Sequence, residues 1–570
     1  MGRPMRVTAL LLIATMSAGC SGAMSDAAPT PTPSPSEAAT EPPKVTPSAT
    51  STTSPIAERL ADMSLAEKVG QLFMPVLYGA KPGAASGENR ARYGVGSPAE
   101  VVKKYHPGGV ILFPWSGNIE NTPQLVALTN GLQKASETPL LIGADQENGL
   151  VSRLGTLVTD VPGSMAIGAT GDPSNARTAA EITGTELRAL GVNLDFAPVA
   201  DVNVNPDNPV IGPRSYGSAP GKVAKMVAAA VEGFHDAGVA AAAKHFPGHG
   251  DTGVDSHTGL PVIKHSPARW RELDAPPFRA AIGKGVDIVM TAHVVMPELD
   301  RSGAPATLSK KIVTGLLRDD LGYGGVVATD ALDMAGVRKK YGDAEVAVRA
   351  VLAGVDLLLM PPDLPKAYGA VLAAVKSGRI TKDRLDASVT RLLKLKATRG
   401  VLTASPADPE DAKAVLRSGD HREKAQKIAD QAVTAVKGAR ALPLKGDILV
   451  TGPAARALAG MLDGAASAPT ADTPTTAEIA AARTAAARAD TVVVTTEDAG
   501  PAQSRLVAAM AATGKPVTVV SLSAPYELSR LGGYDTALAL YSGGSASLRA
   551  AAKALDGTLT PSGDLPVDIR

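Results

Sequence analysis

The sequence predicts an α/β protein: a (β/α)8 TIM-type barrel followed by a smaller α/β sandwich domain. Between residues 56 and 400, apolar or β-branched runs alternate with longer stretches of helical periodicity, as expected for repeated βα units around a parallel sheet. Eight such runs are found, at residues 71–77, 109–113, 140–144, 192–196, 239–244, 287–292, 325–329 and 355–360. Eight strands in one segment favour a closed barrel over an open sheet.

Polar residues directly follow several of these runs, which is the second observation in favour of a barrel. Asp145, His245, His293 and Asp330 each stand just beyond a predicted strand. In a (β/α)8 barrel the loops at the carboxyl ends of the strands form one face, so these side chains are expected to converge. Taken singly, any one of them could be a helix cap or a solvated loop residue, which is the better explanation for an arbitrary loop Asp.

The third observation is a second set of predicted strands after the barrel. Residues 401–423 form a polar connection rich in Asp, Pro and Ala, and residues 424–570 are predicted to form the sandwich, with buried strands at 447–451, 491–495 and 516–522. The turn at Gly452-Pro453 lacks the G-x-G-x-x-G spacing of a dinucleotide-binding loop. We therefore assign this domain no chemistry from its sequence.

The first 20 residues are predicted to be a lipoprotein signal peptide. Arg3 and Arg6 precede an apolar run at residues 7–16, which is too short to span a bilayer. The run leads to Ser17-Ala18-Gly19-Cys20, small residues before the only cysteine in the chain. Lipid attachment at Cys20 is favoured over an incidental thiol, and it predicts export and anchoring to the outer face of a bacterial cytoplasmic membrane.

Composition sets limits on the remaining partners. Residues 21–55 are rich in Pro, Ser and Thr, which is typical of a disordered tether. The chain has 57 Lys and Arg against 56 Asp and Glu, so no net field attracts nucleic acid or an anionic surface. No nucleic-acid partner is expected, and membrane contact is expected through the lipid alone. The sequence leaves the oligomeric state open.

The densest polar cluster runs from Lys244 to Thr252 and continues to Asp255-Ser256-His257. Residues two apart in an extended chain face the same side, so Asp255 can orient His257 as a proton shuttle. A capped structural loop is the plainer reading of such a pair. A metal site is a further alternative, with possible ligands at His245, His249, Asp251, Asp255 and His257. It is disfavoured because cysteine ligands and a helical H-x-x-x-H are missing.

At this loop the sequence resembles the β-N-acetylglucosaminidases of glycoside hydrolase family 3. The loop motif and Leu260-Pro261 match the family signature, and further motifs follow in the family's order. They are Asp145-Gln146-Glu147, Phe196 to Asn203, Asn208-Pro209 through Arg214-Ser215, Thr291-Ala292-His293, Pro305 to Ser309 and Thr329 to Leu332. The resemblance covers the whole barrel. Asn148 and Leu150 stand where the family often has Gly and Arg.

The resemblance implies roles for particular residues. Asp330 would be the nucleophile, and His257, oriented by Asp255, would protonate the leaving oxygen and then activate water. Two displacements at one carbon retain the anomeric configuration. The resemblance also places five residues around the terminal sugar: Asp145, Arg153, Arg214, Lys244 and His245. For Arg153 and Arg214 alone, surface ion pairing is an equally good interpretation, and the surrounding motifs count against it. No cofactor or metal is expected.

The expected activity is hydrolysis of terminal N-acetylglucosamine from peptidoglycan-derived glycans or muropeptides. The nearest alternative is a phosphorylase of the same family, in which phosphate takes the place of water. A histidine as the acid/base permits this alternative, because a neutral imidazole repels phosphate less than a carboxylate does. A non-catalytic cell-wall-binding lipoprotein is a third possibility. It would predict damaged catalytic positions, whereas Asp330, Asp255 and His257 are all present in matching motifs.

Overall fold

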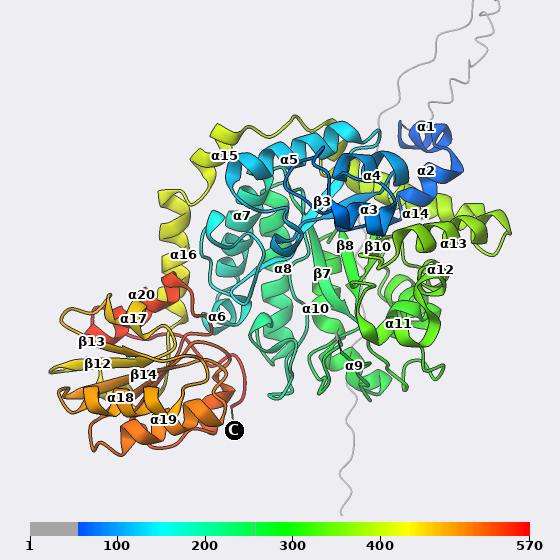
Figure 1. The fold of residues 1–570 in the computed structure, drawn as a ribbon. Coiled ribbons are helices and arrows are strands. Elements are labelled where there is room, and N and C mark those ends of the chain that lie inside the picture. Colours follow the sequence, from blue (N-terminus) through cyan, green and yellow to red (C-terminus); the bar gives the residue numbers. More distant parts are fainter. Residues whose placement is uncertain (1–54, 257, 570) are drawn as a thin grey trace, which may run out of the picture. The chain divides into compact units, whose positions relative to one another are not determined.

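The barrel is closed by eight parallel strands, which confirms the predicted fold. The computed structural model describes residues 55–256 and 258–569, so Cys20 and His257 lie outside the described residues. The strands are β1 (Phe73–Met74), β2 (Gly109–Ile111), β3 (Leu141–Ala144), β6 (Leu194–Asp195), β7 (Ala240–Phe246), β8 (Ile288–Thr291), β9 (Val326–Thr329) and β10 (Leu358–Leu359). Seven of them lie within their predicted runs, whereas β7 begins within its run, 239–244, and extends beyond it to Phe246 (Figure 1).

Closure follows from the strand pairing. Six strands form one sheet in the order β2-β3-β6-β7-β8-β9, and β1 pairs in parallel with β10. Isolated parallel bridges join this pair to both edges of the sheet, Val76 to Ile111 on one side and Ala328 to Leu357 on the other. The short hairpin of β4 (Gln146–Asn148) and β5 (Val151–Ser152) extends from the end of β3.

Helices fill the connections between the strands. Several begin at a proline in the first turn, where its missing N–H costs nothing, and α2 and α4 begin with a complete capping box. They are α1 (Pro55–Asp62), α2 (Leu65–Gly70), α3 (Gly87–Tyr93), α4 (Pro98–Tyr105), α5 (Thr122–Ala135), α6 (Ser164–Ala169), α7 (Pro173–Ala189), α8 (Pro220–Asp236), α9 (Pro267–Leu273), α10 (Ala275–Gly283), α11 (Ala335–Tyr341), α12 (Asp343–Ala353), α13 (Leu364–Lys376) and α14 (Lys382–Thr398). A π-helix spans Lys311–Asp320.

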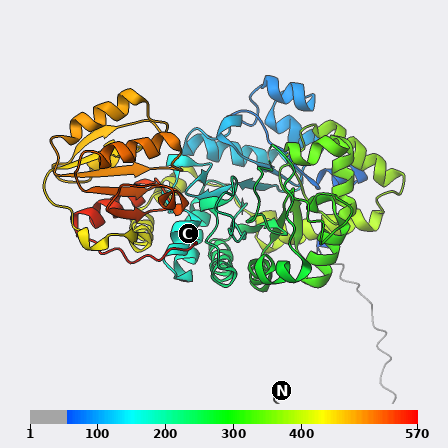
Figure 2. The ribbon, with the colours of Figure 1, turned by 90° about the horizontal axis from the view of Figure 1, so that it is seen from below.

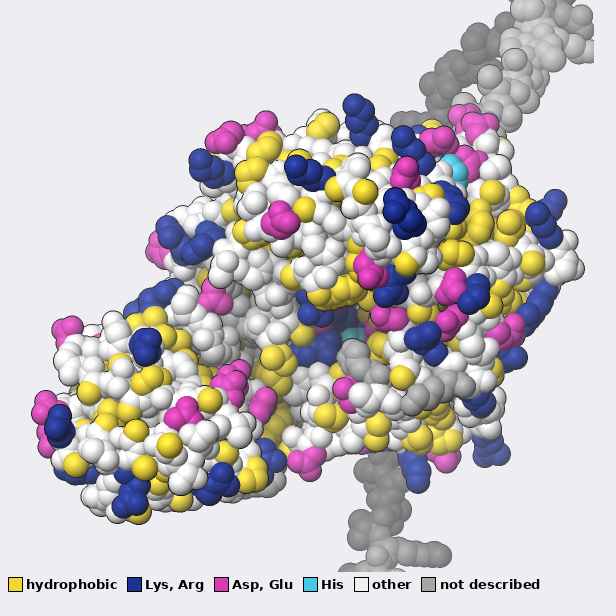
Figure 3. Space-filling model, in the orientation of Figure 1, with side chains coloured by type: hydrophobic (Ala, Val, Ile, Leu, Met, Phe, Trp, Pro, Cys, Tyr) yellow, Lys and Arg dark blue, Asp and Glu magenta, His cyan; other side chains and the backbone are white. Residues whose placement is uncertain are grey.

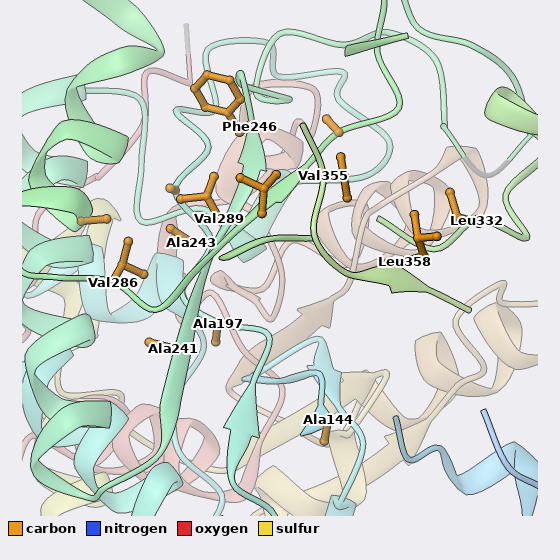
Figure 4. Packing of buried hydrophobic residues seen from close by; sticks show 14 of the residues in the cluster. Ala144, Ala197, Ala241, Ala243, Phe246, Val286, Val289, Leu332, Val355 and Leu358 are labelled. Carbon is orange, nitrogen blue, oxygen red and sulfur yellow. The ribbon is translucent and has the colours of Figure 1, made fainter. Parts of the chain in front are cut away.

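Successive side chains along each strand point alternately into the barrel and toward the surrounding helices, which gives two packed layers. On β7, Ala240 and Ala242 belong to the cluster that fills the barrel, whereas Ala241 and Ala243 belong to the cluster beneath the helices. Figure 4 shows Ala241, Ala243 and Val289 within this outer layer. Leu392 and Leu395 of α14 join the inner cluster. Since successive strand residues point to opposite sides, this is the pattern expected for a filled barrel.

The C-terminal domain is a three-layer sandwich around a six-stranded sheet in the order β11-β16-β15-β14-β12-β13. Its strands are β11 (Thr434–Lys437), β12 (Ile448–Gly452), β13 (Ala466–Pro469), β14 (Thr491–Thr496), β15 (Val517–Ser521) and β16 (Thr536–Ala539), and only β11 is antiparallel to its neighbour. Helices α18 (Thr476–Ala486) and α19 (Pro501–Ala511) cover one face of the sheet, and α17 (Ala455–Ala459) and α20 (Ser545–Asp556) cover the other (Figure 2).

Two helices occupy the region between the barrel and this sheet. Helix α15 (Pro409–Val415) lies within the segment predicted as a linker, and α16 (Gly419–Ala432) crosses the predicted boundary at residue 424. Helix α6 of the barrel contributes Met165, Ala166 and Ala169 to the hydrophobic core beneath α18 and α19. The two domains therefore share one apolar cluster. None of the helices in the described part of the chain combines the length and hydropathy needed to cross a bilayer.

Candidate active site

Four strand ends bring polar side chains to the same face of the barrel. Asp145 follows β3, Lys244 and His245 end β7, His293 follows β8 and Asp330 follows β9. Figure 3 shows a hollow below the position of the β7 label in Figure 1, in which basic, acidic and histidine side chains gather. This convergence agrees with the rule that barrel active sites form at the carboxyl ends of the strands.

A buried ion network forms the base of this site. The Nζ of Lys244 lies 2.8 Å from Oδ1 of Asp145 and 2.6 Å from Oε1 of Glu147. Arg214 donates from Nε and Nη2 to the two oxygens of Glu147, both at 2.8 Å. The side chains of Lys244 and Glu147 are each 2% exposed. Burial alone would raise the pKa of Glu147, but the charges of Arg214 and Lys244 hold that pKa far below its usual value.

A second buried carboxylate, Asp201, orients the two histidines of the loop. Its Oδ2 lies 2.7 Å from Nδ1 of His245, and its Oδ1 accepts the backbone N–H of His249 at 2.7 Å. With Nδ1 facing a carboxylate, the Nε2 of His245 is directed to the Arg214 side, 3.4 Å from Nη2. Burial lowers the pKa of His249 to about 4, so its imidazole is neutral at pH 7.

The end of β7 presents two consecutive side chains to the same network. Strict alternation would send Lys244 and His245 to opposite sides of the strand. The pairing of β7 with β8 shifts register between Lys244 and Phe246. Such a bulge re-aims side chains, and here both residues reach carboxylates of the site, Asp145 and Asp201 respectively.

Asp330 is positioned by the backbone around the end of β9. Its N–H donates to the carbonyl oxygen of Thr291, and its Oδ1 accepts the N–H of Ala331 at 2.7 Å. Burial would raise the pKa of Asp330, but the charges of His245, His293 and Lys244 and the hydrogen bond from Ala331 together lower it. The carboxylate is therefore ionised and oriented at neutral pH, as a nucleophile requires.

The loop that carries Asp255 is anchored at its neighbour, Ser256. The Ser256 side chain is 2% exposed and its Oγ lies 3.0 Å from Nε2 of His249. The other ring nitrogen of His249 lies 3.0 Å from Oγ1 of Thr252. Because Thr252 donates to the carbonyl of His249, its oxygen accepts from Nδ1, and Ser256 then donates to Nε2. Asp255 is partly exposed, and the pairing predicted for it with His257 lies outside the described residues.

Arg153 contacts a residue that follows β2. Its guanidinium stacks over the ring of Phe113 at 5.3 Å, and its buried Nε has no hydrogen-bond partner among the described residues. An unsatisfied buried donor costs about 1–3 kcal/mol, so a ligand oxygen that accepted from it would be bound favourably. The structure therefore groups Asp145, Arg214, Lys244 and His245 in one network, whereas Arg153 contacts Phe113.

Two residues of the site had no role in the sequence analysis: Glu147 and Asp201. The sequence held a signal for Glu147, because residues two apart in an extended chain face the same side and Glu147 is two residues after Asp145. In the structure both carboxylates contact Lys244. Asp201 sits within the apolar stretch Val199-Ala200-Asp201-Val202, where an ionisable residue needs a buried partner. Within the described residues, the group whose geometry could hold a metal ion is Glu67, His106 and Glu137, which lies outside this network.

The C-terminal domain contacts a loop of the barrel that supports the site. Asn203, fully buried, donates from Nδ2 to the hydroxyl of Tyr526 at 2.8 Å. The same loop holds the histidine turn, because Asn208 donates to the carbonyl of His249 and Asn205 to that of Thr252. The sandwich domain therefore stabilises the loop that holds the backbone of His249 and Thr252 in place.

Comparison with known proteins agrees with this arrangement. The model of the glycosyl hydrolase family 3 N-terminal domain matches residues 64–395, more than half of the chain, and that of the C-terminal domain matches residues 436–570. A beta-hexosaminidase A of Pseudoalteromonas piscicida is 41% identical over 61% of this chain, and the match spans 62% of that protein's own length.

Solved structures resemble both domains together. A glycoside hydrolase family 3 beta-N-acetylglucosaminidase from Paenibacillus sp. str. FPU-7 superposes with a TM-score of 0.81 at 39% identity, covering 89% of this chain and 99% of that one. A beta-glucoside phosphorylase superposes with a TM-score of 0.79 at 27% identity, covering 90% of this chain and 96% of that one. By its barrel, its sandwich domain and the ordered motifs at its strand ends, the chain belongs to glycosyl hydrolase family 3.

Proposed function

We propose that this protein is a retaining β-N-acetylhexosaminidase that removes terminal N-acetylglucosamine from glycans. The observation that carries the proposal is Asp330, an oriented and ionised carboxylate beside the Asp145–Glu147–Lys244–Arg214 network. The relatives named beta-hexosaminidase and beta-N-acetylglucosaminidase support this substrate class.

The proposed reaction has two displacements at the anomeric carbon. In the first, Oδ2 of Asp330 attacks that carbon while the glycosidic oxygen leaves with a proton from His257. In the second, His257 takes a proton from water, whose oxygen displaces Asp330 and restores the original configuration. The role of His257 rests on the resemblance of the Asp255-Ser256-His257 motif, since the residue lies outside the described part of the chain.

The buried network would bind the terminal sugar. Asp145 is partly exposed at 17% and can accept hydrogen bonds from sugar hydroxyls, while Lys244, Arg214 and Arg153 supply donors. These groups are held in place before substrate arrives, so little reorganisation is needed during the reaction. We propose GlcNAc-containing fragments of peptidoglycan as the natural substrates.

We also propose that the enzyme is exported and lipid-anchored through Cys20 at the outer face of the cytoplasmic membrane. Arg3, Arg6 and the apolar run at residues 7–16 support this, with the small residues before the cysteine. Metabolic labelling with a fatty acid and membrane fractionation test it. The wild-type protein should be labelled and should sediment with membranes, whereas Cys20→Ala should carry no label and should stay in the supernatant. Label retained in Cys20→Ala would refute the lipidation site.

The activity is tested with 4-nitrophenyl N-acetyl-β-D-glucosaminide and purified protein, beside Asp330→Asn and His257→Ala. Wild type should release nitrophenol, and both variants should lose at least about 10³-fold in kcat. Because nitrophenol leaves readily without a proton, His257→Ala should lose less on this substrate than on a disaccharide of N-acetylglucosamine. Wild-type protein that leaves both substrates intact would refute the proposal.

Phosphorolysis is the second candidate, and the likeness to a beta-glucoside phosphorylase favours testing it. Turnover is compared with and without inorganic phosphate, and the products are examined for sugar 1-phosphate. Hydrolysis predicts free N-acetylglucosamine at an unchanged rate. Faster turnover with formation of the 1-phosphate would establish the phosphorylase instead.

A further inference from the structure

The catalytic face carries an exposed tryptophan beyond the sugar-binding network. Trp115 lies in the 3-10 turn Pro114–Ser116, which follows β2, and its residue surface is 58% exposed. The chain has only two tryptophans, and the other, Trp270, is 2% exposed and donates to the carbonyl of Pro247. Leaving so large an apolar side chain in water forgoes the stabilisation that burial would give.

The turn that carries Trp115 is held firmly. The Oγ of Ser116 donates to the carbonyl of Phe113 at 2.9 Å, and the N–H of Gly79 donates to the carbonyl of Ser116 at 2.9 Å. Asn118 donates to the carbonyl of Gly79 at 3.1 Å. These contacts tie the loop after β2 to the loop after β1, so the indole is exposed on a fixed backbone.

The surroundings of Trp115 connect it to the candidate active site. Its ring stacks on Phe113, with centroids 4.9 Å apart and planes at 26°, and the Arg153 guanidinium lies over the same Phe113 ring. Tyr78 lies 6.0 Å from the indole. The three rings therefore join the loops after β1 and β2, at the carboxyl ends of the strands where the candidate site lies, and Arg153 contacts the same group.

Other exposed apolar residues lie in the loops of the same face. Among the described residues, the large hydrophobic side chains with high exposure are Trp115, Leu150, Val254, Val262 and Leu352. All but Leu352, which is on α12, are in loops that follow β2, β3 or β7. Hydrophobic surface borders the hollow in Figure 3. An apolar rim around a polar pocket marks a binding surface.

We propose that Trp115 is the stacking platform for the sugar next to the scissile bond, on its leaving-group side; this inference rests on the proposed function. The polar network takes the hydroxyls of the terminal sugar in the interior, so the next sugar lies outward, at the rim. The C–H groups on a face of a β-linked pyranose make an apolar surface, which packs well on an indole. Trp115 therefore selects a glycan leaving group over a small one.

Kinetics on β-1,4-linked N-acetylglucosamine trimer test this with Trp115→Ala, Trp115→Phe and the control Leu352→Ala. Trp115→Ala should raise KM for the trimer about tenfold with little change in kcat, the size expected for losing one stacked ring. Trp115→Phe should recover part of the loss, and Leu352→Ala should match wild type. Inhibition by free N-acetylglucosamine, which needs only the terminal-sugar site, should stay within about twofold of wild type. An unchanged KM, or a matching loss of inhibition by the monosaccharide, would overturn the inference.

A binding measurement separates this inference from the proposed activity. Tryptophan fluorescence is titrated with the trimer in the Asp330→Asn background, where no turnover is expected. The signal should change and saturate, and Trp115→Phe, which keeps only Trp270, should abolish the change. Hydrolysis of the trimer by wild type without such a change would leave the activity intact and refute the platform; a saturable change without hydrolysis would support the platform and refute the activity.

Discussion

Glu147→Gln neutralises the central carboxylate of the site while preserving its shape. The native side chain accepts hydrogen bonds from Nε and Nη2 of Arg214 and from Nζ of Lys244, at 2.6–2.8 Å. The amide keeps one oxygen and turns an NH2 group toward cationic donors. Lys244 then keeps its contact with Asp145, whereas Arg214 keeps its hydrogen bond to the carbonyl of Val210 but loses its bidentate carboxylate partner.

Two magnitudes follow from this geometry. Removing one partner of a buried ion pair costs about 3–5 kcal/mol, and because Lys244 keeps its contact with Asp145 the expected loss of unfolding free energy is about 3 kcal/mol. For catalysis, Arg214 and Lys244 lose the group that fixes them. A hydrogen bond to a charged group contributes about 1.5–3 kcal/mol, so kcat/KM should fall by roughly 10- to 100-fold.

The assay pairs urea unfolding with kcat/KM on the chromogenic substrate. The matched control is Glu345→Gln, because Glu345 also contacts two arginines, Arg349 and Arg379, but on the surface with 31% of its side chain exposed. That substitution should cost less than about 1 kcal/mol and leave kcat/KM unchanged. If Glu147→Gln behaves like Glu345→Gln in both measurements, the reasoning about the buried network is wrong.

Three further outcomes are expected. Burial lowers the pKa of His249 to about 4, against ~6.5 in the unfolded chain, so as the pH falls the unfolded chain takes up a proton before the folded protein does. About 3 kcal/mol of stability that is present above pH 6.5 should therefore be lost by pH 4. The substitution His249→Gln should flatten the dependence of the urea midpoint on pH. Tyr526→Phe removes the acceptor of Asn203 and should lower stability by about 1 kcal/mol and kcat more than KM; unchanged kinetics would separate the sandwich domain from catalysis. Arg153→Lys removes the unpaired Nε–H group, so it should raise KM with little loss of stability. Equal inhibition of the wild-type protein and this variant by N-acetylglucosamine would contradict a contact between Arg153 and the sugar.

Most of the barrel could be predicted because its strands are continuous apolar runs. A strand buried on both faces, such as β9 with Val326 and Val327, needs apolar residues at every position, and that signal is local. In the C-terminal domain β12, β14 and β15 were predicted for the same reason. The alanine-rich β13 and β16 and the short antiparallel β11 were not, because Ala and Pro carry little strand preference and pairing with neighbours decides their structure.

The candidate site was only partly predictable. Motif order pointed to Asp330, Asp145 and Lys244, but motif order says nothing about which atoms meet. The Lys244 contact with Glu147 spans 97 positions in the chain, and the register shift at the end of β7 depends on pairing with β8. Such contacts arise from closure of the barrel rather than from local sequence, so their partners appear only in the folded chain.

The apolar cluster shared by α6 and the sandwich domain bears on how the protein can be divided. A cut between α14 and α15 would break the chain but leave Met165, Ala166 and Ala169 packed under α18 and α19. The two fragments should therefore stay together through native purification and part only in denaturant. Expressing residues 55–400 by themselves would instead present that patch to water, and such a product should be prone to aggregation. For this chain the catalytic barrel is not a detachable module.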